Sequence, residues 1–190
     1  MHIAILASGT GSNAVKIIQH VQANYAEVQL SVWSNKKDAP VLDKAAGFDV
    51  PAHTFSRAEF RDPAQVLAQF QAQAVDLIVL AGFLWLVPAH MVKAYPNRII
   101  NIHPALLPKY GGKGMYGMNV HQAVKANQET ESGITIHFVN EHYDEGQVIF
   151  QTSCALQPED SAREIAQKVL KLEHEHFPKV VERFILGDLP

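Results

Sequence analysis

The stretch MHIAILASGTGSN, residues 1–13, decides the fold because it joins a buried strand to a turn and a helix. Residues 3–7 are continuously apolar, which is typical of a strand covered on both faces. The turn Ser8-Gly9-Thr10-Gly11-Ser12-Asn13 follows, and a helical pattern runs from about residue 13 to residue 23. A strand, a turn and a helix in this order predict the opening of a parallel α/β sheet.

The rest of the chain repeats this alternation and then departs from it. Further strands are expected near 28–34, 77–80 and 99–102, separated by helical segments that begin near 40 and, at a capping box, near 56. Two strands, 133–139 and 147–154, then follow one another with no helix between them. A last helix starts at a second capping box near 161. We therefore expect an α/β fold: a single doubly wound, mostly parallel sheet, helices on both faces and an antiparallel strand addition at the C-terminal edge.

Composition narrows the functional classes. The 190 residues, of which 47% are hydrophobic and 18% charged, predict one globular domain spanning 1–190. A net charge of −3 gives no reason to expect nucleic-acid binding. The longest apolar run, from Leu77 to Ala89, is too short to span a membrane, and the N-terminus lacks the basic start of a signal peptide. With a single cysteine, Cys154, we expect a cytoplasmic protein.

Ligands of such sheets bind beyond the carboxyl ends of the strands, so the turns there are the places to look for chemistry. The turn at 8–13 has small residues and precedes a helix, whose free N–H groups suit a phosphate. It lacks the lysine of a P-loop and the third glycine of a dinucleotide fingerprint. The alternative is an ordinary tight turn in which Ser12 caps the helix.

A second candidate is Asn101-Ile102-His103-Pro104, at the end of a buried strand. Residues two apart on a strand point the same way, so Asn101 and His103 share one side. An amide beside an imidazole can stabilise an oxyanion, and histidine moves protons near neutral pH. The alternative is a purely structural histidine.

The third candidate is the turn His142-Tyr143-Asp144-Glu145-Gly146 between the two late strands. Its carboxylate would orient or charge His103 if the fold brings the two turns together. The alternative is a hairpin turn with solvated acids. No metal site is expected, because the remaining histidines are scattered and lack zinc-ligand spacing. Cys154 lies in an apolar strand and is expected to be a core residue.

Five segments together carry a resemblance over nearly the whole chain. They are Ser8-Gly9-Thr10-Gly11-Ser12-Asn13, Ser34-Asn35-Lys36, Leu80-Ala81-Gly82-Phe83, Asn101-Ile102-His103-Pro104-Ala105-Leu106-Leu107-Pro108 and Asp144-Glu145-Gly146-Gln147-Val148-Ile149. With these motifs the chain resembles the folate-dependent formyltransferases, in particular the branch that acts on phosphoribosylglycinamide. The resemblance implies transfer of a formyl group from the co-substrate 10-formyltetrahydrofolate to the amine of phosphoribosylglycinamide in purine (IMP) biosynthesis, without a metal.

The resemblance also implies a role for particular residues. Asn101, His103 and Asp144 match the catalytic set, with Asn101 also against the folate. Protonated His103 would stabilise the oxyanion beside Asn101, and Asp144 would keep it charged and relay a proton. The substrate phosphate would bind Gly11, Ser12 and Asn13, and the ribose Glu173. The folate would contact Arg57, Leu84, Trp85, Leu86 and Val87.

Two departures from the family pattern stand out. Trp85 occupies a position where many members have arginine, and the segment 110–117 is richer in glycine and aromatic residues than expected. That segment is either a lid hinged on glycines or a plain surface loop. Lys168 and Lys171 are both near Glu173 in sequence and are alternative partners for the phosphate.

Three other functions remain as alternatives: a methionyl-tRNA formyltransferase, a 10-formyltetrahydrofolate hydrolase and a non-catalytic nucleotide- or folate-binding protein. The first two are disfavoured because no basic C-terminal domain or N-terminal regulatory domain is expected, and the third because Asn101, His103 and Asp144 occur together. The expected partners are small molecules only, with neither nucleic acid nor membrane, and the chain is expected to be a monomer or homodimer.

Overall fold

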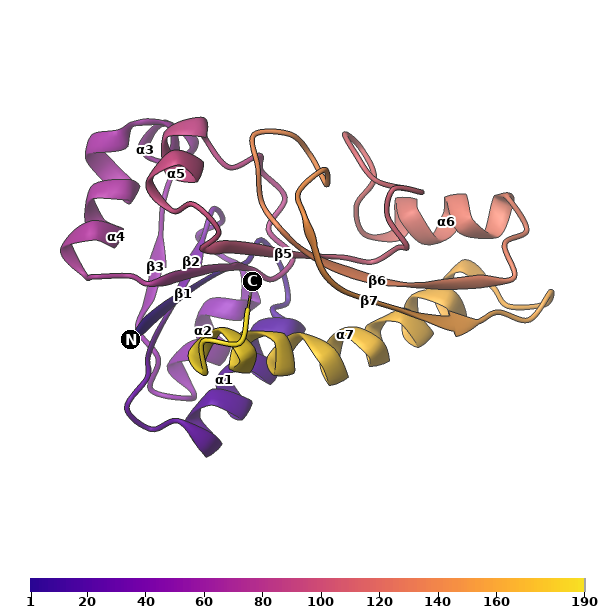
Figure 1. Cartoon of the computed structure of the whole chain (residues 1–190), viewed down its shortest axis with the longest axis horizontal. Helices are drawn as coiled ribbons and strands as arrows, with labels where there is room; N and C mark the ends of the chain where they lie inside the picture. The colour runs from indigo at the N-terminus through magenta and orange to yellow at the C-terminus, as the bar shows by residue number, and fades with distance from the viewer. Residues whose placement is uncertain (190) are drawn as a thin grey trace. The chain divides into compact units, whose positions relative to one another are not determined.

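The computed structural model describes residues 1–189 and contains one seven-stranded sheet (Figure 1). Its strands are β1 (His2–Leu6), β2 (Gln29–Ser34), β3 (Ala52–Thr54), β4 (Leu77–Leu80), β5 (Ile99–His103), β6 (Glu131–Phe138) and β7 (Val148–Ala155). The order across the sheet is β3-β2-β1-β4-β5-β6-β7. The pairs among β1 to β5 are parallel and β6–β7 is antiparallel, which confirms the predicted fold class.

Seven α-helices and one π-helix are described in residues 1–189. They are α1 (Ser12–Asn24), α2 (Pro40–Ala46), α3 (Arg57–Arg61), η1 (Pro63–Leu67), α4 (Ala68–Ala72), α5 (Ala89–Ala94), α6 (Met118–Ala126) and α7 (Ala162–Ile185). Both predicted capping boxes are present, at the starts of α3 and α7. The chain forms two compact units, Met1–Asn101 and Ile102–Pro190.

In the first unit, β1 is the central strand and is buried along its whole length. Ile3 lies opposite Leu30 of β2 on one side and Leu77 of β4 on the other. Helices α1 and α2 cover one face of the strands, and α3, α4 and α5 the other (Figure 1). A strand enclosed on both faces has no solvent side, which explains its uninterrupted apolar sequence.

Two short elements of the first unit were not predicted. β3 has three residues, too few for an alternating pattern to show. Helix α5 begins after Pro88, at the last residue of the long apolar run, and its six residues are too few for a helical period to show. After α3 the chain changes its helical path at Pro63, where the π-helix η1 begins.

In the second unit, β6 and β7 form a hairpin on which α7 packs, and α6 packs against α7. The register shifts by a bulge between Ile136 and His137, just before β6 ends. A Cβ at Gly146 would collide with the carbonyl oxygen of Phe138, so the turn that carries Asp144 requires glycine there. None of the helices in residues 1–189 combines the length and apolar character that a membrane span needs.

Candidate active site

The turns that follow β1 and β4 lie together in the first unit. The Ser8 N–H donates to the Gly82 carbonyl at 3.1 Å, and the Ser8 hydroxyl accepts from the Leu84 N–H at 3.1 Å. The register of β4 and β5 places Leu80 opposite Asn101. The carboxyl ends of β1, β4 and β5 therefore hold candidate residues from three separate segments, as expected for an open α/β sheet.

The turn at 8–13 ends in a helix N-terminus as predicted, but Gly11 rather than Ser12 is the capping residue. Gly11 has φ 68, and a Cβ there would collide with the Val41 side chain, so only glycine fits. Ser12 and Asn13 open α1, and the positive end of the helix dipole lies at this first turn. The Lys44 ammonium, which sequence reasoning missed, donates to the Thr10 carbonyl at 2.8 Å and adds a cation beside this turn.

The residues expected to contact the folate are also in the first unit. In the segment 84–87, Leu84 and Leu86 are exposed, whereas Val87 is buried. The Trp85 ring packs near Phe55, Phe60 and Phe83, with centroids 6.1 to 6.2 Å away. The Arg57 guanidinium lies over the Trp85 ring, 4.9 Å from its centroid. The tryptophan therefore positions Arg57 through a cation–π contact, which an arginine at 85 would not provide.

The second unit brings His103 and Asp144 together, so the condition that the sequence left open is met. His103 ends β5, is 4% exposed, and has its Nδ1 3.5 Å from Asp144 Oδ2. That oxygen also accepts from the Gly112 N–H at 2.9 Å. Because 3.5 Å exceeds a normal N–H···O hydrogen bond, the contact between His103 and Asp144 is an electrostatic pairing rather than a hydrogen bond.

Tyr110 fixes the other side of the His103 ring. His103 Nε2 lies 2.7 Å from the Tyr110 carbonyl oxygen, which can only accept, so Nε2 carries a hydrogen and donates. In the neutral ring Nδ1 is therefore the unprotonated nitrogen, and a proton taken up by His103 arrives next to Asp144. A backbone carbonyl has no signature in a sequence, which is why this contact was not predicted.

A second histidine shares the carboxylate of Asp144. His137, near the end of β6, is 2% exposed, and its Nε2 lies 3.7 Å from Asp144 Oδ1. Its Nδ1 donates to the Phe138 carbonyl at 2.8 Å. Sequence reasoning dismissed His137 as scattered. Its position on the strand leading into the Asp144 turn was the available signal.

Burial and charge oppose each other at this pair. Burial lowers the pKa of His103 below 6.5 and outweighs the opposite effects of the Asp144 charge and the Tyr110 carbonyl. The expectation that Asp144 keeps His103 charged at rest is therefore wrong. Burial acts to raise the pKa of Asp144, but its contacts with His137, His103 and the Gly112 N–H outweigh burial and lower that pKa. At neutral pH the site holds a neutral imidazole beside a carboxylate.

These shifts predict a loss of stability on acidification. Because the pKa of His103 is lowered in the folded protein, the unfolded chain binds a proton at this histidine at a higher pH than the folded protein does. The free energy of unfolding therefore decreases as the pH is lowered from 6.5 to the pKa of the folded protein. Asp144 adds a second loss below pH 3.8. Urea unfolding between pH 7.5 and 5 should show a slope of at most about 1.4 kcal/mol per pH unit from His103. His103→Gln should flatten it, leaving the parts due to the similarly lowered pKa values of His53 and His121. Equal slopes would contradict this.

Glu173 is a buried residue of α7, in the second unit, whereas Gly11, Ser12 and Asn13 belong to the first. Of the two nearby lysines, Lys168 is engaged by the carboxylate of Asp160 and lies 3.4 Å from the Ala155 carbonyl. Lys168 lies on α7 and thus ties the start of this helix to the turn that precedes it.

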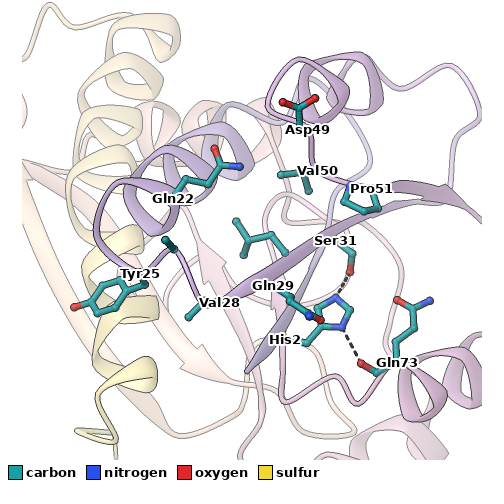
Figure 2. Close-up of a pocket in the computed structure, with 12 residues that line it drawn as sticks. His2, Gln22, Tyr25, Val28, Gln29, Ser31, Asp49, Val50, Pro51 and Gln73 are labelled. Carbon is teal, nitrogen blue, oxygen red and sulfur yellow. Dashed lines mark hydrogen bonds between the residues drawn. The ribbon is translucent and has the colours of Figure 1, made fainter.

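A cavity of about 600 Å³ lies at the opposite, amino ends of the first unit's strands (Figure 2). His2 lines it, but both of its ring nitrogens are used, by the Gln73 carbonyl at 3.0 Å and the Ser31 hydroxyl at 2.8 Å. The Ser31 hydroxyl also accepts from the Trp33 indole at 2.9 Å. This histidine is a structural one, and none of the predicted site residues lines the cavity.

Metal and thiol chemistry find no support in the part of the chain that is described. Residues 1–189 contain no group of three or more His, Cys, Asp or Glu side chains placed to hold a metal ion. Cys154 is half-buried on β7 rather than a core residue, and burial raises the pKa of its thiol. A thiol with a raised pKa is a poor nucleophile.

The strand order, the Asn-x-His sequence at the end of β5 and the aspartate turn beside His103 together are characteristic of one family of enzymes. The family model "Formyl transferase" matches residues 1–181, and the chain belongs to this family. It is 39% identical over 186 residues to the chloroplastic phosphoribosylglycinamide formyltransferase of Arabidopsis thaliana, covering 94% of this chain and 63% of that one. It is 35% identical over 192 residues to the Haemophilus influenzae phosphoribosylglycinamide formyltransferase, covering 98% and 88%.

Solved structures agree with this assignment. The crystal structure of glycinamide ribonucleotide transformylase 1 from Symbiobacterium toebii superimposes with a TM-score of 0.88 at 30% identity, covering 98% of this chain and 88% of that one. The chain spans about three fifths of the length of the plant relatives it matches.

Proposed function

We propose that this chain transfers a formyl group from 10-formyltetrahydrofolate to the amine of phosphoribosylglycinamide, a step of purine (IMP) biosynthesis. The observation that carries the proposal is the buried His103, with Nε2 held by the Tyr110 carbonyl and Nδ1 facing Asp144. Such a group accepts and returns a proton at one defined atom, as direct acyl transfer requires. The choice of acceptor is supported by relatives that are named for this activity. The match to the Haemophilus influenzae phosphoribosylglycinamide formyltransferase covers 88% of that protein.

The reaction begins with attack of the substrate amine on the formyl carbon, which forms a tetrahedral intermediate with an oxyanion and an ammonium. His103, neutral at rest, takes the ammonium proton at Nδ1, where the Asp144 carboxylate stabilises the resulting charge. Asn101 and the charged His103 stabilise the oxyanion. The proton then passes to N10 of the folate as the bond from carbon to N10 breaks, with no covalent enzyme intermediate.

The binding roles follow the same proposal. Gly11, Ser12 and Asn13 hold the substrate phosphate at the first turn of α1, where the positive end of the helix dipole favours an anion. Glu173 contacts the ribose. Arg57, Trp85 and the segment 84–87 contact the folate, with Asn101 at the formyl end. We place the enzyme in the cytoplasm, as a monomer or homodimer.

The test follows deformylation of a 10-formylfolate substrate by absorbance, with phosphoribosylglycinamide, with its dephosphorylated nucleoside and with no acceptor. We expect release that depends on the phosphorylated acceptor and is at least tenfold slower with the nucleoside, since the helix N-terminus then lacks its anion. Equal release without an acceptor would replace the proposal by the hydrolase activity. Absence of release in every case would overturn it in favour of another acceptor or a binding protein.

A further inference from the structure

The His103 ring is hydrogen-bonded to Tyr110, a residue with an unfavourable backbone conformation. Its Nε2 donates to the carbonyl oxygen of Tyr110 at 2.7 Å, and Tyr110 has φ 57, in the left-handed region. A residue with a side chain loses roughly 1–2 kcal/mol there relative to the right-handed conformation. Such a conformation persists only when the surroundings hold it in place.

The side chain of Tyr110 shows what holds it. Its hydroxyl donates to Glu129 Oε1 at 2.8 Å, and the Lys109 ammonium donates to both Glu129 oxygens, at 2.9 and 3.2 Å. These bonds lower the pKa of Glu129, so the carboxylate is ionised and the contacts are charge-assisted. Glu129 itself is fixed just beyond α6, where its N–H donates to the Val124 carbonyl at 3.3 Å.

We propose that Glu129 is a positioning residue for His103, acting through Tyr110. The Glu129 carboxylate anchors the Tyr110 hydroxyl, the anchored tyrosine keeps its left-handed backbone, and its carbonyl fixes the orientation and tautomer of the His103 ring. Glu129 touches no reacting atom. The inference rests on the proposed function for the catalytic role of His103, but the chain of contacts stands without it.

Four groups of the second unit act on the His103 ring. The Asp144 carboxylate and the Tyr110 carbonyl raise its pKa, whereas the neighbouring His137 lowers it. His121, buried on α6 with an unpartnered Nδ1, is the fourth. When the Tyr110 carbonyl moves away, one of the two raising contributions disappears, so the pKa of His103 falls further.

The experiment compares Glu129→Gln and Tyr110→Phe with the unchanged protein. Proton–nitrogen NMR follows the titration of the His103 ring, and steady-state kinetics follow formyl transfer. In both variants the pH at the midpoint of the His103 titration should decrease by about half a pH unit to one pH unit. A shift of this size corresponds to the free energy of one hydrogen bond. On the same basis kcat should fall about 2- to 10-fold, with KM within about twofold.

Two comparisons separate an effect through Tyr110 from a direct effect of the Glu129 charge on His103. Tyr110→Phe removes the hydrogen bond between Tyr110 and Glu129 but leaves the Glu129 charge. The control Glu131→Gln removes an exposed charge two residues away and leaves that hydrogen bond in place. An unmoved His103 midpoint in Tyr110→Phe overturns the proposal, whatever Glu129→Gln does, because the effect would then be one of charge. A shift in Glu131→Gln of equal size also overturns it. If the unchanged protein transfers no formyl group, the proposed function fails, while the titration still decides whether Glu129 positions His103.

Discussion

Asp144→Asn is expected to lower kcat for formyl transfer to phosphoribosylglycinamide by about 10³-fold, within the range of a lost proton-transfer group. The Asp144 carboxylate lies 3.5 Å from His103 Nδ1 and 3.7 Å from His137 Nε2. Its negative charge therefore stabilises a proton that His103 takes up at Nδ1. Asparagine has the same shape and still accepts from the Gly112 N–H. The loss should therefore fall on kcat, with the dissociation constant for the folate unchanged.

The matched control for this variant is Glu145→Gln. It changes the same charge in the same turn, but Glu145 is exposed and forms no part of the His103 contacts. Its kcat should stay within about twofold, as for most surface substitutions. If Asp144→Asn retained more than a tenth of the activity, Asp144 would have no proton to stabilise, and the proposed mechanism would be wrong at this residue.

The second large effect concerns His103→Ala, which should lower kcat by about 10²- to 10³-fold, the usual cost of one lost oxyanion donor. Asn101 is unchanged in this variant and still supplies the other donor, so a residual rate should remain. His142→Ala is the matched control, because His142 is an exposed histidine of the turn that carries Asp144. Normal turnover by His103→Ala would remove this residue from the catalytic set.

The two catalytic variants should not be additive. Since Asp144 acts on the proton that His103 carries, a chain without His103 has nothing left for Asp144 to stabilise. The double variant should thus be within about threefold of the slower single variant. Rates measured under single-turnover conditions would show this directly, and a product of the two separate losses would mean that the two residues act independently.

The strands that are buried on both faces were the most predictable part of the fold. β1 and β4 are continuous apolar runs bounded by turn residues, and a sequence records that pattern directly. β3 and α5 were missed because three or six residues carry too little periodicity to outweigh their neighbours. The antiparallel hairpin of β6 and β7 was predictable from the absence of an intervening helix.

The site was predictable where side chains alone define it. Strand ends and turns marked Asn101, His103 and Asp144 as candidates, and the hairpin brings Asp144 to His103. The resting charge of His103 was not predictable, because a sequence shows a possible carboxylate partner but not the burial that opposes it. The Tyr110 carbonyl and the bulge before His137 are backbone features and have no residue signature.

The bond from His103 Nε2 to Tyr110 has a consequence for the design of inhibitors. His103 Nε2 is already bonded to the Tyr110 carbonyl, and Nδ1, which at neutral pH accepts a hydrogen bond rather than donating one, faces the Asp144 carboxylate 3.5 Å away. A compound aimed at Nδ1 therefore has to offer an N–H or O–H and to fit beside that carboxylate. A compound that needs hydrogen bonds to both ring nitrogens must first displace the Tyr110 carbonyl. Its apparent affinity is then reduced in proportion to the small fraction of molecules in which the bond between His103 and Tyr110 is open.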